Sequence, residues 1–297
     1  MSKVGTTGIG FFQKYLTIWV AICMALGILI GKFLPGIPVF LNQFEYANVS
    51  IPVAILIWVM IYPMMMKVDF QSVKNVGKNP NGLYVTWITN WLIKPFTMYA
   101  IAGLFFYVVF KKIIPSDLAK EYLAGAVLLG AAPCTAMVFV WSTLTKGDPA
   151  YTVVQVATNN LIILIAFVPI VKFLLGVSNV IVPWDTLILS VVLFVVIPLT
   201  GGILTRMLVS RRKGVVYFEK QFLPRFDNAT TAGLLLTLIL LFAFQGEVFL
   251  NNPLHILLIA VPLSIQTFVV FFIAYFASRW LRLPHHISAP GAMIGAS

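Results

Sequence analysis

Long apolar stretches separated by short polar connections are the feature that most constrains this chain. Eight of them approach or exceed the ~20 residues that a helix needs to cross the hydrocarbon core of a bilayer, and a ninth begins near Ile287 and reaches Ser297. Segments in lipid must satisfy their own backbone hydrogen bonds, and runs of this length do so as helices. We therefore predict an all-α integral membrane protein whose loops are too short to form a soluble domain. The approximate segments are residues 15–34, 50–66, 83–110, 122–144, 151–175, 184–209, 229–249, 254–280 and 287–297.

Composition supports a membrane protein over a nucleic-acid-binding protein. Of the 297 residues, 60% are hydrophobic and 10% charged, and the net charge is +11. The basic residues lie in short loops without interleaved aromatic residues, which is typical of membrane topology and argues against nucleic acid as a partner. The two cysteines, Cys23 and Cys134, lie in apolar segments and do not form a disulfide framework. The first apolar run follows a basic N-terminus but lacks a small-x-small cleavage site, so we expect a retained span.

The distribution of Lys and Arg predicts the orientation. The loops on one side carry fourteen of the twenty, the loops on the other side carry five, and the last, Lys94, lies inside a span. Positive residues accumulate in cytoplasmic loops, so we predict a cytoplasmic N-terminus. Residues 206–225, with the cluster Arg211, Arg212 and Lys213, should then form the largest cytoplasmic loop and anchor the topology.

Two short motifs recur in the second half of the chain. The Gly-Ile-Leu triplet at residues 27–29 returns at 202–204, and Leu-Gly-Ala-Ala at 129–132 resembles Ile-Gly-Ala-Ser at 294–297. The glycines are offset by 202 − 27 = 175 and 295 − 130 = 165 residues. Five spans separate the copies, and an odd number of crossings turns the second copy upside down, as in secondary transporters.

This pattern predicts an inverted 5+5 repeat. Residues 1–176 would form the first five-helix repeat and residues 177–297 the second, truncated within its ninth helix. Because the second half should mirror the first, we expect the native protein to continue for about fifty residues, enough for one and a half ~20-residue spans with their loops.

The fourth span contains a predicted helix break. Pro133 removes a backbone donor and clashes with the preceding turn, so the helix should break or kink near residues 131–133. Broken helices at matching places in two halves indicate a transport site. The alternative is a proline kink that only shapes helix packing.

Cys134 follows the break directly. A thiol at the start of a half-helix lies near free N–H groups that favour the thiolate, which is a soft ligand for thiophilic species. The alternative, a small buried hydrophobe, is our interpretation of Cys23, which lies mid-helix without polar neighbours in the sequence.

Residues 128–142, Leu-Leu-Gly-Ala-Ala-Pro-Cys-Thr-Ala-Met-Val-Phe-Val-Trp-Ser, closely resemble the signature of arsenical-resistance efflux permeases, the arsenite branch of the bile acid/arsenite/riboflavin transporter superfamily. Residues 62–70 and 91–96 also resemble that family. The resemblance implies ten spans with discontinuous fourth and ninth helices. It also implies efflux of arsenite, with antimonite as a further candidate, by proton exchange across a plasma (inner) membrane. The family's essential cysteine falls on Cys134, with Pro133 and Thr135 beside it, and its ninth-helix glutamate would lie beyond Ser297.

Four further polar residues within spans are candidates for the transport cycle. Lys94 could serve a proton cycle or snorkel to an interface. Asn90 lies one turn before it on the same face. Asn160, next to Asn159 in the fifth span, and Gln266 in the eighth could line a substrate path or hold helices together.

No enzyme or cofactor is expected, because the sequence places none of the nine acids mid-span. Asp69 and Asp148 fall near helix ends and are interpreted as caps, and the three histidines lack zinc-ligand spacing. Two rival transport functions remain: a sodium-coupled organic anion transporter of the same fold, and a passive channel. A separate ATPase subunit is left open as a partner.

Overall fold

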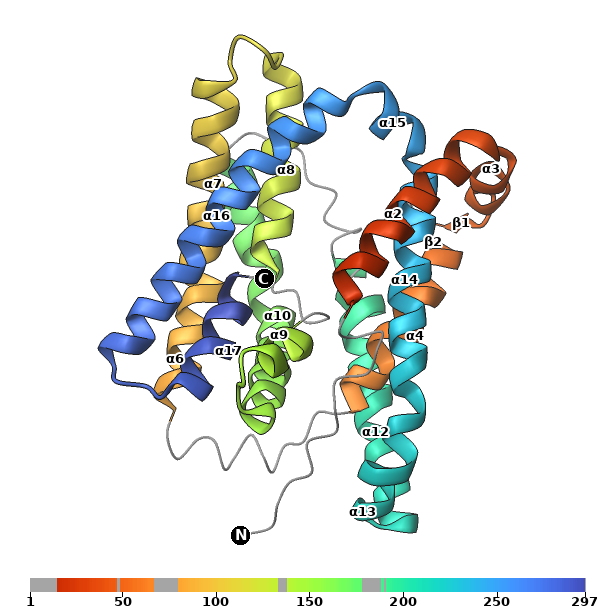
Figure 1. Ribbon diagram of the computed structural model, residues 1–297, viewed down its shortest axis with the longest axis vertical. Helices are drawn as coiled ribbons and strands as arrows, with labels where there is room; N and C mark the ends of the chain where they lie inside the picture. The colour runs from red at the N-terminus through yellow and green to blue at the C-terminus, as the bar shows by residue number, and fades with distance from the viewer. Residues whose placement is uncertain are drawn as a thin grey trace. The chain divides into compact units, whose positions relative to one another are not determined.

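The computed structural model describes residues 15–46, 49–66, 80–132, 138–177, 188–189 and 191–296, and nearly all of them are helical. The predicted all-α class is confirmed. The strands found in this part of the chain form a short antiparallel pair, β1 (Glu45–Tyr46) with β2 (Val49–Ser50). The helices pack into two compact units (Figure 1): unit 1 comprises Met1–Pro63 and Pro224–Asn251, and unit 2 comprises Met64–Leu223 and Asn252–Ser297. This division by packing does not test the predicted sequence repeats.

Unit 1 is built on the pairing of its first and last long helices. Cys23, Gly27 and Gly31 are buried and spaced four residues apart, so they share one face of α2. A Cβ at Gly27 would lie 2.7 Å from the Cβ of Phe242 on α14, so the two helices touch closely only because glycine is there. The helices of this unit are α2 (Leu16–Phe33), α3 (Gly36–Asn42), α4 (Ile51–Met66), α14 (Asp227–Phe244) and α15 (Gly246–Asn251). The last three residues of α4, after Pro63, belong to unit 2.

Unit 2 holds the remaining helices. Its apolar core lies between α7, α8 and α10, where Leu123, Val127, Phe106, Val171 and Leu175 are almost fully buried. Its elements are α6 (Asn81–Ile88), η1 (Thr89–Ile93), α7 (Lys94–Leu104), η2 (Phe105–Val109), α8 (Ser116–Ala131), α9 (Val138–Leu144), α10 (Pro149–Val177), η3 (Val192–Val196), α12 (Ile197–Lys213), α13 (Val215–Tyr217), η4 (Phe218–Phe222), α16 (Pro253–Trp280) and α17 (His285–Ala296). The short η5 (Leu223–Phe226) spans the boundary between the two units.

The helix from α6 to η2 is continuous but contains two π-helical turns. In η1 the backbone N–H of Lys94 bonds to the carbonyl of Thr89, five residues earlier. Pro95 follows and has no N–H, so the α-helical hydrogen-bond ladder cannot run through this point unchanged. π-Helical turns inside α-helices often occur at functional sites.

Residues 206–225, predicted to form the largest cytoplasmic loop, are mostly helical. The prediction of a loop was therefore wrong, and the side of the membrane on which these residues lie stays a prediction. Helix α12 continues through Arg211 and Arg212 to Lys213, and α13, η4 and η5 lead directly into α14. The turn falls at Gly214, whose φ of 86° lies in the left-handed region that glycine adopts without strain. Helix α12 thus ends at this one residue, and the basic cluster occupies its last turn.

The predicted apolar segments all coincide with helices in the described part of the chain, but fewer are unbroken spans. Among the described residues, five helices are long and apolar enough to cross a membrane, or six if the bent pair of α2 and α3, which turns by 94°, is one span. The remaining segments give shorter pieces: α4 has 16 residues, α17 has 12, and the fourth segment is divided between α8 and α9. The seventh segment also ends early, because Gln245 separates α14 from α15.

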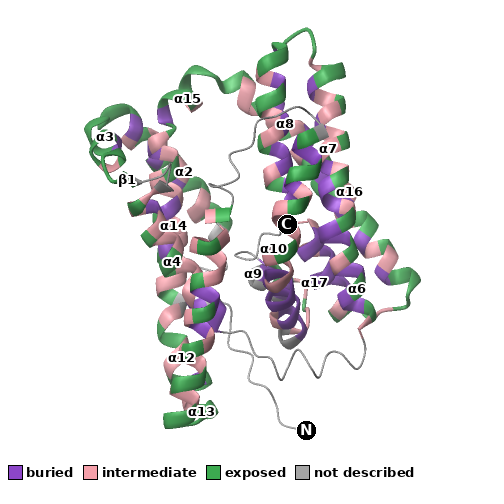
Figure 2. Ribbon diagram, turned by 180° about the vertical axis from the view of Figure 1, so that it is seen from behind, coloured by how far each residue is buried: buried purple, intermediate pink, exposed green. Residues whose placement is uncertain are grey.

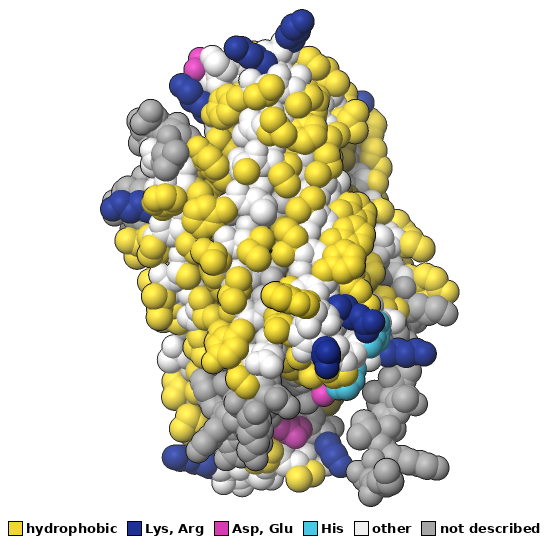
Figure 3. Space-filling view, turned by 90° about the vertical axis from the view of Figure 1, so that its left-hand side faces the viewer, with side chains coloured by type: hydrophobic (Ala, Val, Ile, Leu, Met, Phe, Trp, Pro, Cys, Tyr) yellow, Lys and Arg dark blue, Asp and Glu magenta, His cyan; other side chains and the backbone are white. Residues whose placement is uncertain are grey.

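The surface of the helices suits a bilayer. Figure 3 shows hydrophobic side chains over the middle of one face, with most of the visible charged side chains toward its ends. Many large apolar side chains of the described residues are exposed, including Phe268, Phe272 and Phe276, which are spaced four residues apart on α16. In unit 2, buried positions gather where α6, α10 and α17 meet (Figure 2).

Candidate functional site

A set of polar side chains is buried inside unit 2, although its helices are otherwise apolar. Their burial on facing helices defines a polar seam, and intramembrane polar groups of this kind commonly mark solute pathways. The members are Thr86, Thr89, Asn90, Lys94, Ser142, Thr152, Gln155, Thr158, Asn159, Asn160, Gln266 and Ser288.

Lys94 is buried in the seam and holds the end of α8. Its side chain is 3% exposed, and Nζ donates a hydrogen bond of 3.1 Å to the carbonyl of Ala132. Ala132 follows the last residue of α8 and is extended, with φ −116° and ψ 135°, so the helix ends there. A cation near a helix C-terminus is electrostatically favourable. The snorkelling alternative was therefore wrong: the ammonium points inward to the end of a helix.

Asn90 and Asn159 join η1 to α10. The Asn90 Nδ2 donates to Asn159 Oδ1 at 3.2 Å, and the indole N–H of Trp91 donates to the same oxygen at 2.9 Å. The Asn159 Nδ2 donates to the backbone carbonyl of Gln155 at 2.9 Å. Asn160 has a separate contact, from its Nδ2 to the sulfur of Met65 at 3.7 Å. Asn159, rather than Asn160, thus lies at the centre of the seam.

One turn away, Gln155 makes the equivalent link to α6. Its Nε2 donates to the carbonyl of Gly82 at 3.1 Å and to the Thr86 hydroxyl at 3.0 Å, and it also contacts the Tyr151 hydroxyl. Sequence reasoning missed Gln155 and Thr86. Their spacing could have found them, because each precedes a candidate asparagine by four residues on one helix face.

The end of α17 packs beside the break in the fourth segment. Ile294 forms a buried cluster with Val138 of α9 and Val156 of α10. A Cβ at Gly295 would lie 2.9 Å from the Thr89 side chain, so this small residue lets α17 approach η1. The structure therefore brings the two predicted broken segments together against the polar seam.

Pro133, Cys134 and Thr135 lie outside the described residues. Gln266 lies on α16, is 1% exposed, and its Nε2 has no hydrogen-bond partner in the described part of the protein. Of the predicted site residues, the structure places Asn90 and Lys94 one turn apart on the seam, with Asn159 opposite Asn90.

The ends of the helices carry the predicted caps and histidines. Asp148 accepts a hydrogen bond of 3.2 Å from the backbone N–H of Tyr151, which confirms it as a cap of α10, whereas Asp69 lies outside the described residues. His255 pairs with the Tyr122 hydroxyl at 2.8 Å, and His285 contacts the Thr145 carbonyl. Within the described residues no cluster of three potential metal ligands occurs.

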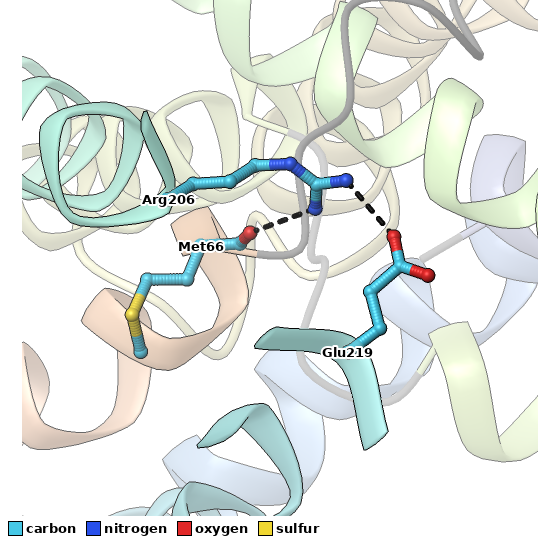
Figure 4. Close-up of polar contacts among 3 residues, drawn as sticks. All are labelled: Met66, Arg206 and Glu219. Carbon is cyan, nitrogen blue, oxygen red and sulfur yellow. Dashed lines mark hydrogen bonds and ion pairs between the residues drawn. The ribbon is translucent and has the colours of Figure 1, made fainter. Parts of the chain in front are cut away.

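Arg206 holds the end of α4 in a similar way to Lys94 at α8 (Figure 4). One guanidinium nitrogen donates to the Met66 carbonyl at 3.3 Å, and the other pairs with Glu219 at 3.0 Å. The guanidinium carbon also lies 5.3 Å from the centre of the Phe218 ring. These contacts fasten α12 to η4 at the basic end of the helix.

The fold and the polar seam define a multi-pass α-helical membrane protein. Residues 54–252 match the model of the sodium bile acid symporter family. The chain is 65% identical over 290 residues to the arsenical-resistance protein Acr3 of Alkaliphilus metalliredigens, covering 98% of this chain and 81% of that protein. It is 45% identical to an uncharacterized transporter of Synechocystis, covering 99% of this chain and 79% of that protein. A second Acr3, from Corynebacterium glutamicum, is 33% identical, over 91% of this chain and 73% of that protein.

The chain therefore belongs to the arsenical-resistance permeases of the sodium bile acid symporter family, which confirms the resemblance seen in the sequence motifs. This is a family of transporters. The orientation of the N-terminus stays a prediction.

Proposed function

We propose that this chain exports trivalent arsenic across the plasma membrane in exchange for protons, with antimonite as a second substrate. The observation that carries the proposal is the 65% identity, along nearly the whole chain, to a protein named for arsenical resistance. The buried polar seam beside the fourth-segment break supports it, because a transported solute needs polar partners at membrane depth.

Helix pairing supports the proposed inverted repeats, residues 1–176 and 177–297. Gly27 of the first segment packs on the seventh segment at Ile239 and Phe242. Its repeat partner, Gly202 of the sixth segment, packs on the end of the second, where a Cβ would lie 2.8 Å from the Met65 Cβ. In an inverted repeat the first segment corresponds to the sixth, and the second to the seventh. The contact between the first and seventh segments therefore corresponds to the contact between the sixth and second segments.

The second motif shows the same exchange. Gly130 of the fourth segment packs on Met98 of the third, and Gly295 of the ninth packs near Ala274 of the eighth. Gly295 also packs against Thr89. Both glycines therefore contact the helix that carries Lys94: Gly295 at Thr89, before Lys94 in the sequence, and Gly130 at Met98, after it. Two such matched pairs support discontinuous fourth and ninth helices at a shared site.

Sulfur supplies the proposed selectivity. Cys134 follows Ala132 by two residues, and its soft thiolate would bind As(III) as substrate. Pro133 would maintain the break, and Thr135 and Asn160 would offer polar groups to the bound solute. A single thiol matters because several thiolates would hold As(III) too tightly for release.

Lys94, Asn90 and Gln266 are the proposed residues of the proton cycle. In one state of the cycle the Lys94 ammonium would lie at the C-terminal end of α8, in place of the coupling cation. Solute would enter from the cytoplasm, where the N-terminus lies in our proposal, and leave on the other side.

A sodium-coupled organic anion transporter is the second candidate. The number of buried polar residues around α6, α10 and α17 favours it, as does the family's description. The thiol in the signature motif argues for arsenite, because an organic carboxylate gains little from a soft ligand.

Uptake into everted membrane vesicles tests the proposal, because export from a cell becomes uptake into such a vesicle. We expect As(III) uptake that a proton gradient drives and that Cys134→Ser abolishes. Vesicles that take up a bile acid with sodium, and no As(III), would favour the second candidate.

A further inference from the structure

Two buried amide oxygens in the polar seam have no hydrogen-bond donor within the described part of the protein. They are Asn90 Oδ1, on η1, and Gln155 Oε1, on α10, and the two residues are 1% and 0% exposed. Buried polar atoms almost always have a partner, so each exception needs an explanation. An amide could in principle be turned around to remove the problem, but the neighbouring groups prevent it.

The orientation of Asn90 is fixed through Asn159. The Trp91 indole can only donate, so the atom it reaches on Asn159 is the oxygen. The Gln155 backbone carbonyl can only accept, so the atom facing it is the Asn159 nitrogen. Since the Asn159 oxygen faces Asn90, Asn90 must present its nitrogen there. Its own oxygen is left without a donor.

The orientation of Gln155 is fixed separately. The carbonyl of Gly82 can only accept, so the Gln155 atom 3.1 Å away is Nε2. The Thr86 hydroxyl donates to the same Gly82 carbonyl at 3.1 Å, which leaves its oxygen to accept from Gln155. Two independent sets of contacts therefore leave an acceptor without a donor in one seam.

The charge nearby limits what these oxygens could bind. Amide oxygens without donors suit either a metal cation or the O–H groups of a solute. Lys94 lies one turn after Asn90 on the same helix and is 3% exposed, so its ammonium charge would repel a second cation at Asn90. An anion without O–H groups would bring its own acceptor oxygens next to these amide oxygens, and no hydrogen bond could form between them. A neutral solute with several hydroxyl groups satisfies both limits.

We propose that Asn90 Oδ1 and Gln155 Oε1 form an acceptor subsite that recognises the hydroxyl groups of an uncharged trihydroxide, arsenous acid or its antimony counterpart. The inference rests on the proposed function and deepens it. The thiol selects a soft element, and the subsite selects its neutral hydroxylated form over oxyanions such as phosphate and arsenate. Asn159 and Trp91 act as positioning residues, because they orient Asn90.

Concentration-dependent As(III) uptake by the full chain in everted vesicles tests this subsite. Asn90→Leu and Gln155→Met each remove an acceptor at nearly constant volume. We expect each to raise KM about three- to tenfold, the effect of losing one neutral hydrogen bond, and Gln155→Met to keep Vmax within about twofold of wild type. Thr237→Val is the control, because it deletes a buried hydroxyl of α14 that bonds to its own helix at Gly233; its KM should not change.

The outcomes separate the proposals. If the wild type takes up no As(III), the proposed function fails. If it does, and a variant that reaches the membrane keeps the wild-type KM, the acceptor subsite alone is overturned. A second measurement uses only the wild-type protein, so it does not depend on whether a variant folds. If the subsite binds a neutral hydroxylated solute, wild-type As(III) uptake should not depend on sodium and should not be inhibited by millimolar phosphate or arsenate. Sodium dependence that Asn90→Leu removes would assign the oxygens to a cation instead.

Discussion

Replacing Lys94 by methionine removes one ammonium group from the middle of a long apolar helix while nearly preserving side-chain length. Two effects on stability oppose each other. The charged hydrogen bond to the Ala132 carbonyl, 3.1 Å long, contributes about 1.5–3 kcal/mol. Taking an ammonium group out of water costs several kcal/mol, and methionine does not incur that cost. We therefore expect the free energy of unfolding to change by less than about 2 kcal/mol.

Transport should change much more than stability. If the ammonium–carbonyl bond forms in one state of the cycle and breaks in another, losing about 1.5–3 kcal/mol in that state shifts the populations by about ten- to a hundredfold. As(III) uptake into everted vesicles by Lys94→Met should fall by a similar factor at wild-type levels of inserted protein. Lys94→Arg keeps a cationic donor and should retain more activity. Wild-type uptake by Lys94→Met would refute a role of the charge in the cycle.

Three further outcomes are expected. A reporter inserted within residues 210–220 should be cytoplasmic by protease or alkaline-phosphatase assay, and a periplasmic reporter would reverse the proposed orientation. Cys134→Ser should abolish As(III) uptake, whereas Cys23→Ser, a change on the packing face of α2, should transport nearly as wild type. Gly202→Leu should lower the thermal stability of the purified protein by several degrees, because even a Cβ there would lie 2.8 Å from that of Met65; unchanged stability would contradict the proposed close pairing of the second and sixth segments.

The positions of the helices were predictable from the sequence because lipid imposes a simple rule. A segment that must satisfy its own backbone has to be helical, and its apolar length shows where it lies. The ends were less predictable. The charged residues after Arg206 suggest a loop, yet they continue α12 because Arg and Lys are good helix formers near a helix C-terminus, and only Gly214 stops the helix.

The polar seam was predictable in part. Lys94, Asn90 and Asn159 stand out because they are polar residues inside apolar runs. Their partners do not: Lys94 reaches a carbonyl 38 residues away, and Asn90 reaches an amide 69 residues away. Such pairs depend on how helices rotate and pack, and one chain's sequence contains no direct record of that.

The α2–α14 pair also has a consequence for the order of assembly. The end of α2 at Phe33 and the start of α14 at Asp227 are 227 − 33 = 194 residues apart. At a synthesis rate of ~5–20 residues per second, α2 waits about 10–40 s in the membrane before its partner emerges from the ribosome. During that time the glycine face of α2 is open to lipid, to other helices of the chain or to an insertion factor. Helix α2 thus stays in the membrane without this neighbour while most of the helices between them in the sequence are made.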